Sequence, residues 1–503
     1  MPDAPNILLL FTDQQRYDTI GALGGLYPYI QTPALDSLVR EGVSFTSAYT
    51  PSPVCVAARC SLVLSQWPHQ TGCTTNSPMP QERTSLMQLL NAEGYQTHGI
   101  GKMHFSPDGR KLWGFESREF SEEGGRSDQD DFSVFLKENG FGHVLNLHGI
   151  RSEFYYVPQP SQLPERLHHT RWVANRSLEF LKRRDRSRPF FLWSSFIKPH
   201  PPFESPIPWL RLYKPVEIGF PYLPRDYEQL LTFWNRLQNR YKYRDQGFDG
   251  NLVRLIRAQY CACVSFVDSS VGRILAALRE TGELDRTLVI FTSDHGEMLG
   301  DYGSYGKRSI LDPASRVPLL VRYPERFAAD TRCDTPVSLV DVLPTCLGAA
   351  GVRVPDDRAG LDLADVARGQ CDREGVLIQF SQDGSGLYGY ATREYKYSYS
   401  AADSREWLFT RAPNQRDERS LAGNVAYEGA LQHMRAGLID HFRRDGYTAP
   451  LDGDGWRQFP KREVPSDPDA WQLFQEGGPV DGLFPEGYEP RCKPQGGLPV
   501  RGI

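Results

Sequence analysis

The 503-residue sequence has no long hydrophobic run, and no stretch approaches the roughly 18 apolar residues that a membrane-spanning helix needs. The apolar run near the N-terminus, Ile7–Phe11, is too short for the core of a signal peptide and follows no basic cluster. These absences predict a protein without a membrane segment or secretory signal. We therefore expect a cytoplasmic location, or a periplasmic one if a signal has been trimmed.

The sequence also lacks an excess of basic residues, since 57 Lys and Arg stand against 62 Asp and Glu, for a net charge of −5. This balance argues against a general nucleic-acid binder. None of the nine cysteines has the C-x-x-C spacing of a zinc or redox site, and their number is odd. Reduced thiols are therefore expected rather than a disulfide framework.

What the sequence does contain is an alternation of strand-like and helix-like segments. Short apolar runs with polar or Gly/Pro borders predict strands at Ile7–Phe11, Phe190–Trp193, Leu288–Phe291 and Leu319–Val321, and mixed three- and four-residue apolar spacing predicts a helix over Leu252–Leu278. This alternation predicts an α/β domain over residues 1–375, with a large, mostly parallel mixed sheet between layers of helices.

The pattern changes near residue 376. Strand-like segments at Val376–Phe380 and Tyr390–Tyr399, followed by a helix around Ala426–Phe442, predict a smaller α+β subdomain over residues 376–476, with an antiparallel sheet and one helix. The segment Gly477–Ile503 contains 7 Gly and 5 Pro among its 27 residues. Because it also carries apolar side chains that an unpacked tail would expose to solvent, we expect an extended arm that crosses to another subunit of a homo-oligomer.

Polar side chains follow two of the predicted strands. Asp13 and Gln14 come directly after the first strand, and Asp294 and His295 follow the strand near residue 290. In an open α/β sheet, ligands bind at the carboxyl ends of the strands. Carboxylate and amide oxygens with one imidazole would suit a divalent cation, although either Asp could instead cap a helix.

A third candidate site is the segment from Cys55 to Arg59. The run Ala57–Leu64 favours a helix, which places Cys55 at or just before a helix N-terminus, where an anionic nucleophile or substrate is stabilised. Arg59 lies about one turn later and is expected to reach back to the same spot. Taken alone, Cys55 is better explained as an ordinary buried thiol.

Together these segments resemble the sulfatase family. Cys55-x-Ala57-x-Arg59 resembles the signature Cys-x-Pro-x-Arg, with Ala57 in place of the proline. The opening strand with Asp13, then Gly101-Lys102-Met-His104, Lys198-Pro-His200, Ser293-Asp294-His295-Gly and Gly306-Lys307-Arg308 follow in the family's order, over roughly residues 6 to 350. The resemblance places the chain in the alkaline phosphatase-like superfamily. Gln14 and His295, where many sulfatases have Asp and Asn, resemble bacterial phosphonate monoester hydrolases and choline-sulfatases.

The resemblance implies roles for individual residues. A formylglycine-generating enzyme would oxidise Cys55 to formylglycine. One divalent cation would be bound by Asp13, Gln14, Asp294, His295 and residue 55; Ca²⁺ is the expected ion, with Mn²⁺ or Mg²⁺ as alternatives. The implied catalytic residues are Cys55, Arg59, Lys102, His104, His200 and Lys307. Hydrated formylglycine would attack the sulfur of a small-molecule or glycan sulfate ester, His200 would protonate the leaving alcohol, and His104 would promote expulsion of sulfate.

Several alternatives remain open from the sequence. A phosphonate monoester or phosphodiester hydrolase would use the same scaffold, a phosphatase would use Ser or Thr in place of Cys55, and a silent binding protein would keep Cys55 as a thiol. Lys102 and His104, two residues apart, are expected to point the same way from an extended segment. Lys198 and Arg308 are weaker candidates for the site, and His69 is expected to close the signature helix structurally.

Overall fold

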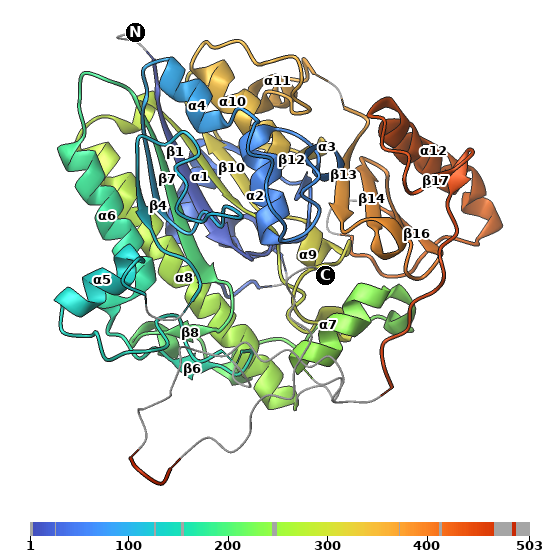
Figure 1. Ribbon diagram of the computed structural model, residues 1–503, viewed down its shortest axis with the longest axis horizontal. Coiled ribbons are helices and arrows are strands. Elements are labelled where there is room, and N and C mark those ends of the chain that lie inside the picture. The colour runs from blue at the N-terminus through green and yellow to red at the C-terminus, as the bar shows by residue number, and fades with distance from the viewer. Residues whose placement is uncertain are drawn as a thin grey trace.

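The computed structural model describes residues 4–25, 27–124, 127–151, 155–243, 249–371, 373–411, 415–466 and 485–488. Within these residues, the largest sheet has eight strands in the order β11-β2-β10-β9-β1-β7-β4-β5 (Figure 1). Its strands are β1 (Asn6–Asp13), β2 (Val43–Phe45), β4 (Gln96–Gly101), β5 (Ser117–Phe120), β7 (Phe190–Pro199), β9 (Thr287–Ser293), β10 (Leu319–Arg322) and β11 (Thr331–Cys333).

The sheet is mixed and mostly parallel, as predicted. The five neighbours β9, β1, β7, β4 and β5 all run in the same direction. The exception is β10, which pairs antiparallel with both β9 and β2, while β11 is again parallel to β2. The carboxyl ends of β9, β1, β7 and β4 therefore meet along one edge, where the ligand site of such a sheet is expected.

The central strand β1 is buried on both faces, which explains its unbroken apolar sequence. Ile7, Leu9 and Phe11 contribute to one hydrophobic cluster, and Leu8 and Leu10 to a second cluster on the opposite face. This division follows from the two-residue period of side chains along a strand. A strand with water on one face would instead alternate apolar and polar residues.

Helices cover both faces of the sheet (Figure 1). The cluster that contains Leu8 and Leu10 includes residues of α1 (Pro33–Glu41), α5 (Asp131–Glu138), α6 (His169–Arg183) and α8 (Gly250–Glu280). The other cluster includes residues of α2 (Cys55–Leu64), α4 (Leu86–Ala92), α10 (Val342–Ala349) and α11 (Leu363–Ala367). The signature helix α2 is buried along its whole length between the sheet and its neighbours.

Helix α8 corrects the expectation that no segment is apolar enough to cross a membrane. Its 31 residues include a window whose length and composition would suffice for a span. In the structure, 72% of that window is buried within the protein, against α6, α1 and β7. The low polarity of α8 is therefore accounted for by its place in the core.

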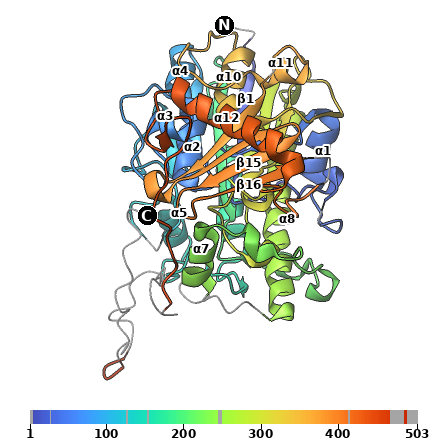
Figure 2. The ribbon, with the colours of Figure 1, turned by 90° about the vertical axis from the view of Figure 1, so that its right-hand side faces the viewer.

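The C-terminal part is the predicted antiparallel sheet with one long helix. Its strands are β13 (Gly375–Phe380), β14 (Leu387–Thr392), β15 (Tyr395–Ser400) and β16 (Arg405–Thr410), and α12 (Glu428–Arg444) crosses one face (Figure 2). The single strand expected over Tyr390–Tyr399 is wrong, because a tight turn separates β14 from β15. The Thr392 hydroxyl accepts a hydrogen bond from the backbone N–H of Tyr395 there, at 3.1 Å.

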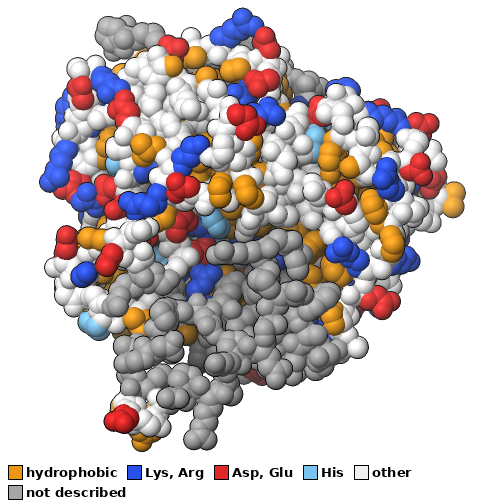
Figure 3. All heavy atoms as spheres, viewed as in Figure 1, with side chains coloured by type: hydrophobic (Ala, Val, Ile, Leu, Met, Phe, Trp, Pro, Cys, Tyr) orange, Lys and Arg blue, Asp and Glu red, His pale blue; other side chains and the backbone are white. Residues whose placement is uncertain are grey.

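The boundary at residues 375 and 376 is not tested by these observations and stays a prediction. Side chains on both sides of it, from α2 through β14 and α12, belong to one continuous hydrophobic cluster. The proposed arm Gly477–Ile503 lies outside the described residues except for positions 485–488. On the face shown in Figure 3, basic and acidic side chains are interspersed among the described residues.

Candidate active site

The carboxyl ends of four adjacent parallel strands each deliver a polar side chain to the same edge of the sheet. Asp13 is the last residue of β1, and Asp294 directly follows β9. Lys102 directly follows β4, and His200 directly follows β7. All four residues are buried. The strand order alone thus brings together groups that lie up to 281 positions apart in the sequence.

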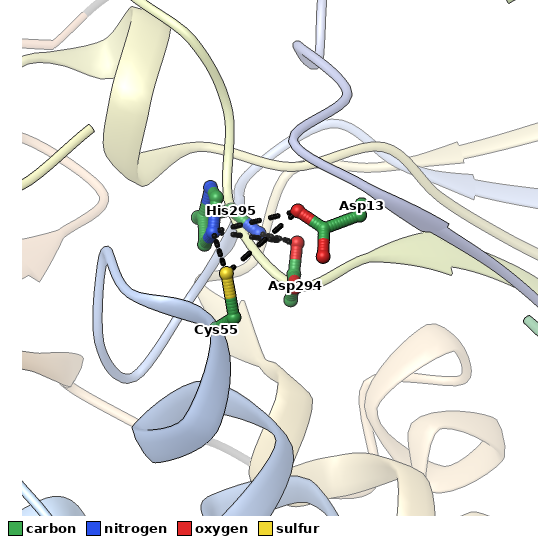
Figure 4. A group of neighbouring side chains, drawn as sticks. All are labelled: Asp13, Cys55, Asp294 and His295. Carbon is green, nitrogen blue, oxygen red and sulfur yellow. Dashed lines mark hydrogen bonds and ion pairs between the residues drawn. The ribbon is translucent and has the colours of Figure 1, made fainter. Parts of the chain in front are cut away.

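Cys55 approaches this edge from the opposite side as the first residue of α2 (Figure 4). Its Sγ lies 3.2 Å from His295 Nε2, 3.8 Å from Asp13 Oδ1 and 2.8 Å from Lys307 Nζ. Asp13, Cys55, Asp294 and His295 offer ligand atoms that all lie within 4.8 Å of one another, and all four residues are buried. Cys55 is therefore at the centre of a polar cluster, not in an apolar pocket.

The surrounding cations favour negative charge at position 55. Burial and the nearby Asp13 both raise the pKa of the Cys55 thiol, but the cations, Lys307 first and then Lys102, outweigh them and hold that pKa well below its ordinary value. The same contact works in reverse on Lys307. Burial lowers the pKa of its ammonium, yet Cys55 and Asp13 raise it above the usual range, so Lys307 keeps its charge.

Arg59 fixes the two carboxylates of the cluster. Its Nε donates to Asp294 Oδ2 at 3.0 Å, its Nη2 to Asp13 Oδ2 at 3.1 Å, and its Nη1 to the Lys102 carbonyl at 2.6 Å. The guanidinium is fully buried and lies 4.8 Å from the centre of the Phe11 ring. Arg59 thus reaches the carboxylates beside position 55, although its hydrogen bonds go to Asp13, Asp294, Lys102 and Ser195 and not to Cys55 itself.

The donor atoms around Asp13 and Asp294 fit a hard divalent cation. His295 Nδ1 lies 3.0 Å from the Gly296 carbonyl, a contact that assigns the proton to Nδ1 and leaves the Nε2 lone pair facing the carboxylates. Gln14 Oε1 is buried and has no hydrogen-bond partner among the described residues. Burial and the adjacent Asp13 raise the pKa of Asp294, a repulsion that a bound cation would relieve. Carboxylate and amide oxygens with one imidazole suit Ca²⁺, Mg²⁺ or Mn²⁺.

Comparisons with known proteins agree with this geometry. A model of the Sulfatase family matches residues 5–352. An arylsulfatase of Clostridium perfringens is 31% identical over 477 residues, which cover 88% of this chain and 96% of that protein. The chain belongs to the sulfatase family. It is accordingly a member of a family of hydrolases that act on sulfate esters.

Other similarities cover both parts of the chain. A model of the C-terminal region of N-sulphoglucosamine sulphohydrolase matches residues 300–441. A choline-sulfatase of Rhizobium meliloti is 29% identical over 448 residues, covering 84% of this chain and 83% of that protein. The crystal structure of the phosphonate monoester hydrolase of Agrobacterium radiobacter has a TM-score of 0.76 at 24% identity, covering 88% of this chain and 96% of that chain. This last similarity shows a shared fold.

The sulfatase pair Lys102 and His104 is arranged differently from the expectation. Strand β4 ends at Gly101, and His104 has a left-handed backbone with φ of 53°, so the two side chains do not alternate along an extended segment. Lys102 Nζ lies 2.5 Å from Asp13 Oδ2, inside the site. The backbone N–H of His104 donates to Glu122 Oε1 at 2.7 Å. Among the described residues, no hydrogen bond joins the His104 ring to Cys55.

His200 lies on the same side of the cluster as Lys102. Its Nδ1 is 2.7 Å from the Pro201 carbonyl and 3.3 Å from Glu123 Oε2. Burial and the cation of Lys307 hold the pKa of His200 well below its ordinary value. The ring is therefore neutral at pH 7 in this arrangement, and it must gain a proton before it can act as an acid.

Sequence reasoning missed several residues around the sulfatase site. Glu123 pairs with Lys102, with Arg151 at 3.2 Å and with His200, and Glu297 contacts the side chain of Gln14. Glu123 belongs to a loop in which no motif is recognisable, so the sequence offered no signal for it. Glu297 stands only two positions after His295, and its place within the motif was the available clue.

Lys198, Arg308 and His69 make their described contacts outside the cluster. Lys198 Nζ lies 2.6 Å from the Pro202 carbonyl and 3.1 Å from Glu204. The guanidinium of Arg308 lies 5.6 Å from the centre of the Phe380 ring. His69 Nε2 is 2.7 Å from Asp445 Oδ2, which links the segment after α2 to the C-terminal subdomain. The structural role expected for His69 thus has a specific partner.

The buried ionic group of Lys198, Glu204 and His168 predicts that the free energy of unfolding depends on pH. Glu204 also lies 2.9 Å from His168 Nε2, and although burial raises the pKa of Glu204, His168 and Lys198 lower it to about 2. Because the folded pKa is below the unfolded one, the stabilisation is complete above about pH 5 and disappears as pH falls toward 2. We expect Glu204→Gln to lower the free energy of unfolding by about 3 kcal/mol at pH 7, and by less near pH 4. Urea unfolding at the two pH values measures this difference, and an equal loss at both would contradict it.

Proposed function

We propose that this protein hydrolyses sulfate monoesters with a formylglycine derived from Cys55 as the nucleophile. One divalent cation lies beside the nucleophile, and Ca²⁺ is the ion we favour. The observation that carries the proposal is the position of Cys55 Sγ, 2.8 Å from Lys307 Nζ and 3.2 Å from His295 Nε2 in a fully buried cluster. The sulfur marks where the oxygens of the modified residue would lie. Its oxidation requires a formylglycine-generating maturation enzyme as a partner.

Formylglycine would supply, as its hydrate, one hydroxyl to attack sulfur and a second that gives its proton to a base, for which the resemblance implies His104, so that the C–O bond to sulfate breaks and the aldehyde returns. The chain's own residues support this chemistry. Lys307 and Lys102 place positive charge beside the point of attack, where the sulfate oxygens gain charge. Asp294 lies beside position 55 and can accept the proton of the attacking hydroxyl. His200, once an anionic substrate has raised its proton affinity, can protonate the leaving alcohol.

The cation would be held by Asp13, Gln14, Asp294, His295 and residue 55, and would supply Lewis-acid stabilisation of the charged oxygens. The unpartnered Gln14 Oε1 and the lone pair of His295 Nε2 support this assignment. Elemental analysis of the purified protein is expected to find one Ca²⁺, Mn²⁺ or Mg²⁺ per chain. Two zinc ions per chain would instead indicate a phosphatase.

A phosphonate monoester or phosphodiester hydrolase is the second candidate, favoured by the structural similarity to the Agrobacterium enzyme. The charge of Lys102, whose ammonium contacts Asp13 beside the reaction centre, suits singly charged substrates, which include sulfate esters, phosphonate monoesters and phosphodiesters, and argues only against phosphate monoesters. A dianionic phosphate ester would gain more from these cations before reaction, which strengthens binding without raising the rate of the chemical step.

Two measurements on one preparation test the proposal. Mass spectrometry of the peptide around Cys55 is expected to show formylglycine in active material. The ratio kcat/KM, measured for an aryl sulfate, a phenylphosphonate and an aryl phosphate with the same leaving group, is expected to be highest for the sulfate. A phosphonate preference of about 100-fold, equal to about 2.7 kcal/mol, would assign the protein to the second class. Active material with only unmodified Cys55 would refute the nucleophile.

A further inference from the structure

We propose that Glu297 is a positioning residue that orients the Gln14 side-chain amide, so that the amide oxygen Oε1 faces the cation site. Glu297 also anchors the loop that carries Lys307. This inference rests on the proposed function in one respect, namely that Gln14 is a cation ligand. No role for Glu297 follows from the nucleophile, the carboxylates or the cations described above. Its side chain is fully buried directly behind them.

The main chain of Gln14 is held in an unusual conformation. Its φ of 67° lies in the left-handed region, which costs free energy for a residue with a side chain. Its N–H donates to Asp294 Oδ1 at 3.0 Å, and its carbonyl accepts from the Tyr260 hydroxyl at 2.8 Å. These two bonds fix the backbone but leave the amide group free to adopt either of two flipped orientations.

Glu297 removes that freedom. The Gln14 amide nitrogen donates to Glu297 Oε2, and a carboxylate can only accept hydrogen bonds. The flipped orientation would set an amide oxygen against a carboxylate oxygen, which is repulsive. The amide oxygen must therefore point away from Glu297, and it is buried without a hydrogen-bond partner among the described residues, as a metal ligand would be before the ion arrives.

Every described partner of the Glu297 carboxylate is a donor. Oε2 also accepts from the Tyr156 hydroxyl at 2.9 Å, while Oε1 accepts from the backbone N–H groups of Leu299, at 3.0 Å, and of Gly306. These bonds use the acceptor capacity of both oxygens, so Glu297 acts through its neighbours and is not itself a ligand.

The bond to Gly306 extends the effect to the other side of the reaction centre. Gly306 immediately precedes Lys307, whose Nζ lies 2.8 Å from Cys55 Sγ. One buried carboxylate thus contacts both the amide of a cation ligand and the loop that carries a cation beside residue 55. Residues behind metal ligands commonly alter metal affinity by about 10- to 100-fold when they are replaced.

The experiment is calorimetric titration of the full-length, metal-stripped protein with CaCl2, which needs no turnover. Glu297→Gln is expected to weaken Ca²⁺ binding by about 10- to 100-fold, because a glutamine at this position can donate to Gln14 and stabilise the flipped amide. The double variant Gln14→Glu with Glu297→Gln is expected to bind within about threefold of the wild type. In it, the carboxylate introduced at position 14 accepts from the new amide at position 297 and still presents an oxygen to the ion.

Tyr156→Phe is the matched control, because it keeps the Glu297 carboxylate and removes only a neutral hydroxyl, which donates to the same Glu297 oxygen and lies 3.5 Å from the Gln14 amide nitrogen. It is expected to change Ca²⁺ affinity less than threefold, by the ordinary scale of one neutral hydrogen bond. An unchanged affinity in Glu297→Gln would overturn the inference, and so would an equal loss in the double variant, which would indicate a merely structural role. If wild-type protein binds none of Ca²⁺, Mg²⁺ and Mn²⁺, the cation part of the proposed function fails instead, and the inference falls with it.

Discussion

Replacement of Cys55 by Ser is expected to lower the steady-state turnover of sulfate esters by about four orders of magnitude, the scale on which loss of a catalytic nucleophile acts. Serine supplies one hydroxyl in the place of Cys55 Sγ, between Lys307 and His295, so a single attack on sulfur remains possible. The resulting sulfate ester on the introduced serine has no second hydroxyl on the same carbon, and sulfate cannot leave by C–O cleavage. Each enzyme molecule should therefore react once and stop.

Two measurements check this expectation. Initial rates with an aryl sulfate give the turnover, and intact-protein mass spectrometry detects the sulfate that the introduced serine retains. Cys60→Ser is the control, because Cys60 lies on the same helix α2 and its thiol is absent from the cluster around Asp13. It should retain activity within about threefold, because the introduced hydroxyl is similar in size to the buried thiol and can keep its hydrogen bonds to Cys73 and Thr71. Sustained turnover by Cys55→Ser would refute the formylglycine mechanism.

The strands and the cluster of candidate cation ligands around Asp13 were predictable because each depends on a local pattern. Ile7–Phe11 and Leu288–Phe291 are apolar runs that are followed within three residues by a carboxylate, and parallel neighbours place such ends together. Cys55 was predictable because the helical run after it fixes the start of α2. These features need only the sequence near each residue and one rule about sheets.

The features that sequence reasoning missed depend on contacts between distant segments. The direction of the Arg59 guanidinium is set by Asp294, 235 positions away, and no local pattern specifies it. The left-handed backbone of His104 is accompanied by a hydrogen bond to Glu122, which belongs to a loop without a motif. Glu297 was visible within a motif, but its partners, Gln14 and Gly306, are defined only by the fold.

One such distant contact joins the two parts of the chain. Lys396, in the C-terminal sheet on β15, is buried with its Nζ 2.5 Å from Asp312 Oδ1 and 2.6 Å from Asp417 Oδ2. Asp312 begins the short helix α9 (Asp312–Ser315), close in sequence to Lys307. Its backbone N–H also donates to Asp417 at 2.9 Å. The Lys396 ammonium therefore bridges two buried carboxylates where the C-terminal sheet meets the catalytic part, and Arg316 also contacts Asp312, at 3.4 Å.

We expect Lys396→Met to lower the free energy of unfolding by about 3–5 kcal/mol at pH 7, because it leaves the buried Asp417 carboxylate without its cation and Asp312 with Arg316 alone, at 3.4 Å. The loss should shrink at pH 5. Burial already raises the pKa of Asp417 although Lys396 lowers it, and removing Lys396 raises that pKa further; a raised carboxyl pKa makes the folded protein less stable as pH increases. Urea unfolding followed by circular dichroism measures both effects.

Lys461→Met, at an exposed position, is the control and should change stability by less than about 0.5 kcal/mol. Adding Asp417→Asn to Lys396→Met should restore part of the lost stability, since it removes the carboxylate that Lys396→Met leaves unpaired. If Lys396→Met is as stable as the control, the buried ionic group does not hold the C-terminal sheet against the catalytic part.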